Sequence, residues 1–492
     1  MGRSVQGLLD PTGGLLISDG WNSTQSRPIL NALLSTPAGS LFLRSVDTSG
    51  DSKDAQYIAD FMISCINEVG PQFVVAICMD GACVSSFPII MAEIPHVFCF
   101  ICPTHSVDNF LKNVCGSQQE IVVRSVRTSE DEKSFEWGST VFSEPMEQAW
   151  EVIKFATHHC KPLSIFRALA KSPETWEGTS QPTALELVKF CETRFASRIL
   201  MLTRYRQLRP VLELLVVNPG FKAWVAKQKR ATRDQADEVR ELVQNTEHWK
   251  AVELADRVLA PVLMVLRLTD GKTGATLGKV YHLMSTVSAL FENPIEGLSD
   301  TVREKMHALF MARWTYFHEP VFTAAYFLDP EFIRGSGDDA EEAEFREVMS
   351  VMCQAAHCPH TLPEMMAEWA ALQTAISVES HGMSAEEAFS VTAQGMPAFE
   401  WARTYLIYWP CIKYAACRLP SLACSASACE HSWSIEGWVH SKKRNRLGQS
   451  FVECLVRTHT NLLLESKLDL WLAKVMPWEI EMVILEPEEE AE

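Results

Sequence analysis

Short apolar segments alternate with turns near the start of the chain, and this spacing limits the fold more than any other feature. The segments that we expect to form strands are 14–18, 28–36, 41–46, 73–79 and 96–101. Short connections join the first three, which predicts an antiparallel meander. Apolar residues at helical spacing predict helices over 54–69 and 87–93. The order β-β-β-α-β-α-β indicates an α/β sheet that begins with hairpins.

After residue 140 strand patterns become rare and helix starts multiply. A hydroxyl side chain followed three residues later by Glu or Gln is a capping-box pattern, and it predicts helix starts at Thr183, Thr232 and Thr301. We therefore expect residues 144–420 to form an all-helical block. Within this block, the acidic stretch 335–347 is predicted to be an exposed connection.

The C-terminal part combines helices with two charged segments. Helices are predicted over 425–437 and from Ser450 onwards. A basic run lies between them at 442–446, and residues 486–492 form an acidic, solvated tail.

Charge and composition restrict the classes of function. The chain holds 44 Lys and Arg against 62 Asp and Glu, and this net charge of −18 argues against non-specific coating of nucleic acid. The sequence has no apolar run of about 18 residues and no basic start followed by an apolar core, so neither a membrane span nor a secretory signal is predicted. Its 15 cysteines are typical of reduced thiols in the cytosol or nucleus. Because binding sites are local, the basic run at 442–446 leaves DNA binding possible.

Two aspartates occupy equivalent positions in the predicted sheet. Asp19 and Asp80 are each the first polar residue after an apolar segment, and each precedes a glycine. Ligands bind at the carboxyl ends of strands in open sheets, and two carboxylates that meet there need a cation such as Mg²⁺ between them. The alternative interpretation is that Asp-Gly is simply a turn. Glu430 likewise has two interpretations, as a third metal ligand or as the end of a capping box that starts at Ser427.

Longer strings of residues resemble the hAT-type transposases. Five segments resemble the transposase-associated domain of unknown function in that family, and they are 18–22, 27–31, 42–50, 53–58 and 95–105. Residues 324–330 are similar to a helical block in the middle of the family's members, and 425–434 with 440–447 closely resemble the C-terminal dimerisation region. The segments occur in the family's order.

The resemblance implies an α/β fold with an RNase H-like mixed sheet, interrupted by a large all-helical insertion, and with a C-terminal helical dimerisation region. Residues 1–140 are the implied first part of the RNase H-like domain, and 141–420 are the implied insertion. The last catalytic helix and the dimerisation region are expected over 421–470, and the acidic tail over 471–492.

The family's acidic trio falls on Asp19, Asp80 and Glu430. The resemblance implies that these residues are catalytic and bind Mg²⁺ or Mn²⁺ for DNA cleavage and strand transfer. The implied partners are DNA and further copies of the chain, as a homodimer or higher homo-oligomer whose contact surface we expect over 438–465. The implied location is the nucleus.

Further residues are expected to contact DNA. His105 ends a Cys-x-x-His string that the family shares, and Arg194 with Phe195 matches the family's Arg-Trp pair. Phe195 is either a stacking platform for a base or an ordinary core aromatic. The basic run completes the set with Lys442, Lys443, Arg444 and Arg446.

A second group of possible metal ligands has two interpretations. Cys353, His357, Cys358 and His360 lie close together in the sequence. They could bind a metal, but no paired Cys-x-x-Cys accompanies them, so the alternative is an ordinary helix end.

Two functions fit these features. The first is an hAT-like transposase with an intact acidic trio. The second is a domesticated or truncated transposase-derived protein without catalysis, which acts as a dimerising, DNA-associated interaction module. Members of the family commonly begin with a zinc-bearing DNA-binding finger, whereas Met1 lies only 18 residues before Asp19. We therefore expect weak DNA binding, and the sequence leaves enzymatic activity open.

Overall fold

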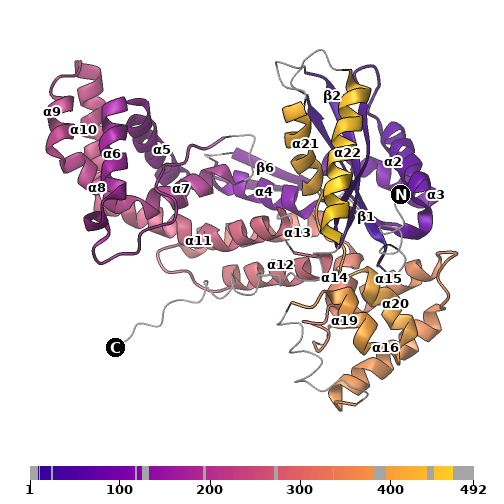
Figure 1. Cartoon of the computed structure of the whole chain (residues 1–492). Helices are drawn as coiled ribbons and strands as arrows, with labels where there is room; N and C mark the ends of the chain where they lie inside the picture. The colour runs from indigo at the N-terminus through magenta and orange to yellow at the C-terminus, as the bar shows by residue number, and fades with distance from the viewer. Residues whose placement is uncertain are drawn as a thin grey trace. The chain divides into compact units, whose positions relative to one another are not determined.

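The computed structural model of the chain describes residues 9, 12–23, 26–116, 119–124, 132–191, 196–270, 275–335, 337–380, 395–439 and 448–468. The chain divides into two compact units, which are shown in Figure 1 and described separately below. Unit 1 contains Met1–Ser106, Arg267–Thr286 and Trp314–Glu492. Unit 2 contains Val107–Leu266 and Val287–Arg313.

A five-stranded sheet forms the centre of unit 1. Its strands are β1 (Gly14–Asn22), β2 (Pro28–Thr36), β3 (Gly39–Asp47), β4 (Val74–Met79) and β5 (Phe98–Ile101). They lie in the order β3-β2-β1-β4-β5. The first three strands pair in antiparallel fashion, whereas β4 pairs with β1 and β5 pairs with β4 in parallel fashion. This mixed RNase H-like pattern, followed by a large helical region, confirms the predicted fold class.

The two central strands are buried along most of their length. Every residue of β4 is buried, and Leu15, Leu16 and Ile17 of β1 are each 0% exposed. Such continuous apolar runs are typical of parallel strands that are covered on both faces. The core of unit 1 therefore lies at the strands that also carry the two predicted aspartates.

β1 continues through Asp19, so the prediction that the strand ends at residue 18 is wrong. Asp19 pairs with Asn31 of β2, and this antiparallel pairing extends β1 to Asn22. The parallel pairing with β4 stops earlier, at Ile17. Asp19 thus lies in a strand, and the interpretation of Asp19-Gly20 as a simple turn is also wrong.

The edge strand β3 is covered by α22 (Gln449–Leu468). The side-chain amide of Asn461 accepts a hydrogen bond from the Phe42 backbone N–H at 2.8 Å and donates one to the Phe42 carbonyl at 3.1 Å. Glu453 accepts a third bond from the Ser45 N–H at 3.2 Å. One helix thereby satisfies backbone groups that an edge strand otherwise leaves open to pairing with another chain.

The other helices of unit 1 include α2 and α3 beside the sheet and a later group that ends at α21. They are α2 (Ala55–Val69), α3 (Phe87–Glu93), α14 (Pro320–Leu328), α15 (Asp339–Cys353), α16 (Leu362–Ser377), α19 (Ala398–Tyr405), α20 (Pro410–Arg418) and α21 (Ser427–Val439). The predicted exposed connection over 335–347 is wrong from Asp339 onwards, because Asp338 and Glu341 form a capping box that starts α15. Acidic residues in a first helical turn are stabilised by the helix dipole, which explains their concentration there.

In its described residues, unit 2 consists of helices and a β-hairpin. The hairpin pairs β6 (Gln119–Arg124) with β7 (Glu132–Trp137). The helices are α5 (Ser143–His158), α6 (Cys160–Lys171), α7 (Ser197–Gln207), α8 (Arg209–Val217), α9 (Pro219–Val225) and α10 (Arg230–Gln244). Four more helices have residues assigned to both units, and they are α4 (Pro103–Val114), α11 (Thr246–Asp270), α12 (Leu277–Glu292) and α13 (Asp300–Phe317).

The three capping-box predictions do not mark helix starts. Thr183 lies outside any helix, and Thr232 lies inside α10, which begins after Lys229. Thr301 lies inside α13, where Ser299 accepts a hydrogen bond from the Val302 N–H instead. Of the helices in the described ranges, none combines the length and apolar character needed to cross a membrane.

Candidate metal centre

Asp19 is held in the sheet with one carboxylate oxygen unsatisfied. The residue is 9% exposed, and its Oδ1 accepts a hydrogen bond from the Gly20 N–H at 2.7 Å. No described residue donates a hydrogen bond to Oδ2. Burying a carboxylate oxygen without a partner costs free energy, so this position favours a bound proton or a cation.

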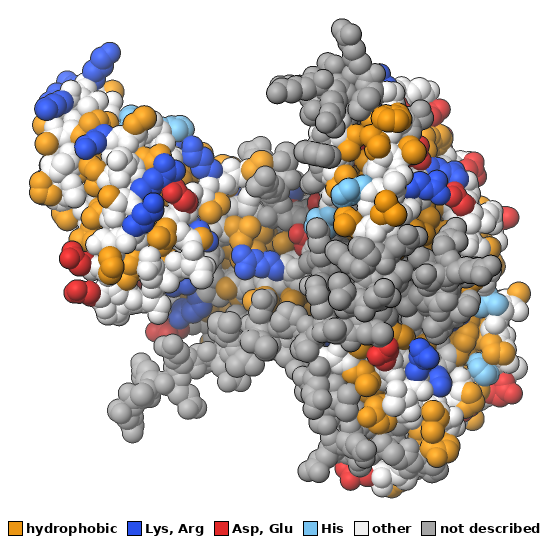
Figure 2. All heavy atoms as spheres, in the orientation of Figure 1, with side chains coloured by type: hydrophobic (Ala, Val, Ile, Leu, Met, Phe, Trp, Pro, Cys, Tyr) orange, Lys and Arg blue, Asp and Glu red, His pale blue; other side chains and the backbone are white. Residues whose placement is uncertain are grey.

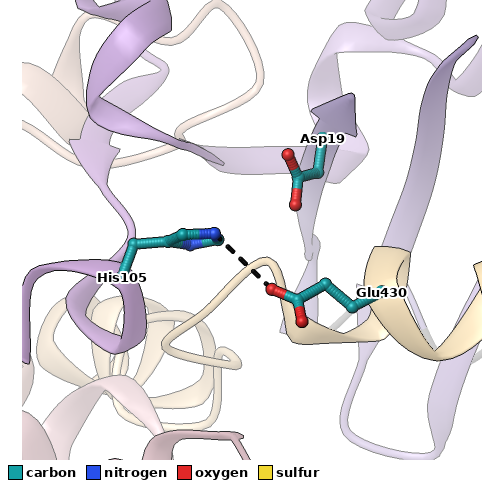
Figure 3. A group of neighbouring side chains, drawn as sticks. All are labelled: Asp19, His105 and Glu430. Atoms are coloured by element: carbon teal, nitrogen blue, oxygen red, sulfur yellow. Dashed lines mark ion pairs between the residues drawn. The ribbon is translucent and has the colours of Figure 1, made fainter. Parts of the chain in front are cut away.

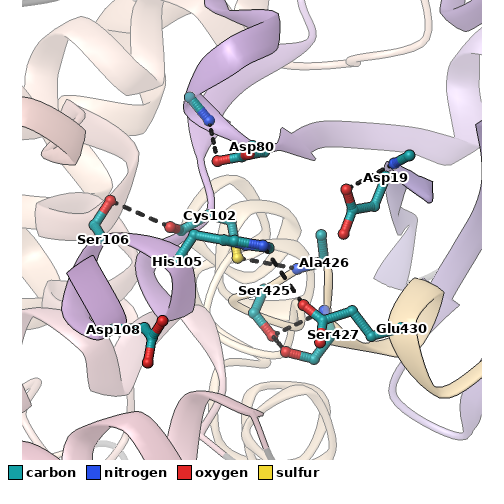
Figure 4. A network of polar contacts seen from close by, with 12 residues as sticks. Asp19, Asp80, Cys102, His105, Ser106, Asp108, Ser425, Ala426, Ser427 and Glu430 are labelled. Atoms are coloured by element: carbon teal, nitrogen blue, oxygen red, sulfur yellow. Dashed lines mark hydrogen bonds and ion pairs between the residues drawn. The ribbon is translucent and has the colours of Figure 1, made fainter. Parts of the chain in front are cut away.

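Glu430 reaches the same place from the first turn of α21. The segment before that helix is fixed by Ser425, whose hydroxyl donates to the Thr269 carbonyl at 2.6 Å, and by the Ala426 N–H, which lies 3.4 Å from the Cys102 sulfur (Figure 4). Glu430 then directs Oε1 to His105 Nε2 at 3.5 Å. Glu430 therefore belongs to the acidic cluster, whereas the capping-box pattern alone favoured a local role.

His105 stands opposite the two carboxylates. It lies in the first turn of α4, directly after β5, and the sulfur of Cys102 is hydrogen-bonded to it. Figure 3 shows the side chains of Asp19, His105 and Glu430 converging from three different elements. One ligand atom from each residue lies within 4.8 Å of the others. Within the described ranges, these are the residues that meet closely enough to hold one metal ion.

Asp80 lies beside this group. Continuing the β1–β4 register two residues beyond the Ile17–Cys78 pair leads to Asp19 and Asp80. The Oδ1 atom of Asp80 accepts a hydrogen bond from the Gly81 N–H at 2.6 Å and so caps the 3₁₀ helix η2 (Gly81–Ser86). The charge of Asp80 influences the pKa of Asp19, but Asp80 is not one of the three residues within 4.8 Å (Figure 4).

Burial dominates the acidity of the cluster. It raises the pKa of Asp19 to about 7 and the pKa of Glu430 to about 8, while the charge of His105 lowers both. Burial lowers the pKa of His105, but the hydrogen bond and charge of Cys102, together with the charges of Asp80 and Asp19, outweigh this effect and raise it to about 10. The metal-free cluster thus retains protons near neutral pH, as expected where carboxyl groups meet without a cation between them.

The donor set fits a divalent cation. Mg²⁺ and Mn²⁺ prefer carboxylate oxygens, and an imidazole is also acceptable to Mn²⁺. The Oδ2 atom of Asp19 is buried without a hydrogen-bond donor among the described residues, and the buried Oε1 of Glu430 has His105 Nε2 as its ion-pair partner at 3.5 Å. These are the atoms that a cation would neutralise.

Two further contacts fix α21 on the sheet next to the cluster. Asn31 lies opposite Asp19 in the sheet, is 0% exposed, and donates a hydrogen bond from Nδ2 to Ser432 Oγ at 3.2 Å. Trp21 of β1 stacks on Trp433 of α21, with ring centroids 5.9 Å apart and planes 14° apart. These four residues were not predicted as functional. They lie within the strings that carry the hAT resemblance, which is the signal that could have identified them.

The other predicted site residues are not brought to this cluster. Arg194, Phe195, Lys442, Lys443, Arg444 and Arg446 lie outside the described residues. Cys353, His357, Cys358 and His360 are described, but they do not converge into a three-ligand group. Instead, His360 Nδ1 lies 3.4 Å from the sulfur of Cys411, and His357 packs edge-on against His96.

Family models match both ends of the chain. Residues 9–129 match the domain of unknown function DUF659, and residues 381–462 match the hAT family C-terminal dimerisation region. This combination is typical of hAT transposase-family proteins. The first match contains Asp19, Asp80 and His105, and the second contains Glu430, so the candidate metal centre of this hAT-related chain joins the two regions. No curated protein matches the chain.

Proposed function

We propose that the chain is an hAT-like transposase that cleaves DNA and transfers strands with Mg²⁺ or Mn²⁺. The observation that carries this proposal is the convergence of Asp19 and Glu430, which are 411 residues apart in sequence, with His105 in one half-buried cluster. Asp19 Oδ2 is buried without a hydrogen-bond donor among the described residues, and the buried Oε1 of Glu430 makes a long ion pair with His105 at 3.5 Å. These two carboxylate oxygens are therefore positioned to bind a cation.

Asp19 and Glu430 would hold the metal, with Asp80 beside them as the third acidic residue. Bound divalent ions supply an activated water or hydroxyl nucleophile and stabilise the leaving oxygen in phosphodiester chemistry. The chain itself contributes orientation, because the contacts Asn31–Ser432 and Trp21–Trp433 hold Glu430 against the sheet. The half-buried setting strengthens the charge interactions within the cluster relative to those at an open surface.

His105 adds a positive charge at the same place. Because its pKa is raised to about 10, its imidazole holds a proton at both nitrogens near neutral pH. We propose that His105 interacts with the negatively charged DNA backbone at the cluster, in keeping with its predicted role as a DNA contact. In the metal-free protein the same charge pairs with Glu430.

The C-terminal region supports assembly into a homodimer or a higher homo-oligomer. α22 buries Val452 and Val456 on its inner side, but Phe451 and Leu462 remain 53% and 59% exposed. A helix with a second, exposed apolar side is typical of an interface, and this helix lies largely within the matched dimerisation region. We propose that the outer side of α22 contacts a second copy within the predicted surface over 438–465.

The proposed organisation follows the predicted domains, with a catalytic first part over 1–140, an insertion over 141–420 and the last catalytic helix with the dimerisation region over 421–470. We propose that the protein acts in the nucleus, where its DNA substrate would be.

The test is DNA cleavage by the purified chain with Mn²⁺ or Mg²⁺. We expect the wild type to nick duplex DNA, and we expect Asp19→Asn and Glu430→Gln each to reduce the rate more than about 100-fold, since loss of a ligand should exceed the 10- to 100-fold cost of losing its supporting groups. Asp60→Asn changes an exposed carboxylate of α2 in the same way and should have no effect. A folded, dimeric wild type that cleaves no DNA with either metal would refute catalysis and favour the non-catalytic interaction module.

A further inference from the structure

We infer that residues 219–233, which comprise α9, its connection to α10 and the first turn of α10, form a surface that binds the phosphate backbone of DNA. Residues 219–233 contain five basic residues and no acidic one, in a chain whose net charge is −18. The five are Lys222, Lys227, Lys229, Arg230 and Arg233, and all are exposed. Figure 2 shows Lys and Arg side chains gathered at the end of unit 2 where α9 and α10 lie. We call these five residues the basic turn.

The charges of the basic turn are largely unpaired. Arg230 lies 3.8 Å from Asp234, and both side chains are highly exposed. The other four members make no ion pair with any residue that the structure describes. Elsewhere in unit 2, by contrast, Lys154 and Lys250 pair with glutamates on their own helices. Unpaired cations gathered on one surface favour a polyanionic partner.

The position of these charges on α10 is unfavourable without such a partner. Lys229 is the N-cap residue of α10, and Arg230 and Arg233 follow in its first turn. Positive charges at a helix N-terminus are unfavourable, because they oppose the helix dipole. The N-terminus also lacks a side-chain cap and acidic residues. Its backbone N–H groups and the basic side chains would all be stabilised by one ligand type, a phosphate group.

Aromatic packing and a backbone hydrogen bond hold the basic turn in place. Phe221 is 0% exposed, and Trp224 packs against His159, which links α5 to α6, and against Phe155 of α5, with ring centroids 5.1 Å and 6.2 Å away. The connection itself is hydrogen-bonded, since the Gln228 N–H donates to the Val225 carbonyl at 2.9 Å. A fixed array of cations loses less conformational entropy on binding than a flexible one.

The choice of DNA among polyanions rests on the proposed function. The surface needs no metal and reads no base sequence, because phosphate contacts position a duplex without specifying it. It also supplies local positive charge that the acidic chain as a whole lacks.

The test measures binding of the full chain to a fluorescent DNA duplex of arbitrary sequence in EDTA, across a range of salt concentrations. The variant Lys227→Gln/Lys229→Gln/Arg233→Gln removes three predicted phosphate contacts. At about 0.9 per contact, the slope of log affinity against log salt should become shallower by about 2.7. The control Lys154→Gln/Lys250→Gln/Lys305→Gln changes charge equally on three other helices of unit 2 and should keep the wild-type slope.

Equal slopes for the two triple variants would overturn the inference. So would a wild type that binds polyglutamate through the basic turn but binds no DNA, since the partner would then be an acidic protein. Because EDTA excludes metal-dependent cleavage, the outcome is separate from catalysis. If binding depends on the basic turn while no metal supports cleavage, the surface stands and the nuclease proposal fails. If the wild type cleaves DNA but substitution of the basic turn leaves the salt slope of binding unchanged, the nuclease proposal stands and the surface proposal fails.

Discussion

Raising the pH of the metal-free protein should destabilise unit 1 through its acidic cluster. Folding raises the pKa of Asp19 from 3.8 to about 7 and the pKa of Glu430 from 4.5 to about 8. A carboxyl group whose pKa is higher in the folded state contributes stability below its unfolded value and loses that contribution as the pH rises to the folded value. The loss therefore extends from about pH 4 to about pH 8. The raised pKa of His105 acts in the same direction, from 6.5 towards about 10.

The size of the effect follows from these shifts. The shift of Asp19 is about 7 − 3.8, or about 3 pKa units, and at about 1.36 kcal/mol per unit it corresponds to about 4 kcal/mol. Glu430 has a shift of similar size, but the two carboxyls repel each other and titrate as a pair, so their contributions do not add. We expect about 4 kcal/mol for the pair. At an unfolding entropy of about 2.1 cal/mol/K per residue, a unit of this size loses about 1.6 °C per kcal/mol, so the melting temperature falls by about 6 °C.

The assay compares melting temperatures in EDTA between pH 4 and pH 9 for the wild type and for Asp19→Asn/Glu430→Gln, whose neutral side chains have nearly the same shape. The wild type should lose about 6 °C relative to the double variant as the pH rises. Added Mn²⁺ should restore the wild type at the high end of this range and leave the double variant unchanged. Asp60→Asn is the matched control. Parallel melting curves for the wild type and the double variant would refute the assignment of raised pKa values to this pair.

Three further substitutions test the contacts around the cluster and the C-terminal helix. Asn31→Leu should weaken Mn²⁺ binding about 10-fold with little loss of folding stability, because Ser432 keeps its other hydrogen bond. An unchanged Mn²⁺ affinity, measured by electron paramagnetic resonance, would count against a positioning role for Asn31. Asn461→Ala should cost about 1–3 kcal/mol and speed amide exchange in β3, since two backbone groups lose their partner, and unaltered exchange would contradict the capping of that edge. Phe451→Ser/Leu462→Ser should weaken dimerisation in analytical ultracentrifugation at least about 10-fold, and an unchanged dimer would place the interface elsewhere.

Local patterns predicted most of the sheet because each strand is bounded by turns. β2 and α3 occur with their predicted limits, and the order of strands and helices in the sheet region is correct. The end of β1 was missed because an antiparallel neighbour, which local spacing does not reveal, extends the strand to Asn22. The start of α15 could have been predicted, because Asp338 and Glu341 have capping-box spacing. The density of acidic residues instead led to the prediction of an exposed connection.

The cluster itself could not be assembled from local patterns. Asp19 was found by its position after an apolar segment, whereas Glu430 looked like a helix cap and was selected only by the family resemblance. His105 was predicted to contact DNA. Its approach to both carboxylates depends on the direction in which α4 follows β5, which local patterns do not reveal. Contacts such as Asn31–Ser432, between residues 401 positions apart, follow from the tertiary fold alone.

The most direct test of the metal centre is Mn²⁺ titration of the full chain, monitored by electron paramagnetic resonance. We expect the wild type to bind Mn²⁺, and Asp19→Asn and Glu430→Gln each to weaken binding by more than about 10-fold while Asp60→Asn binds as the wild type does. Equal Mn²⁺ affinity in all four proteins would contradict the assignment of Asp19 and Glu430 as metal ligands.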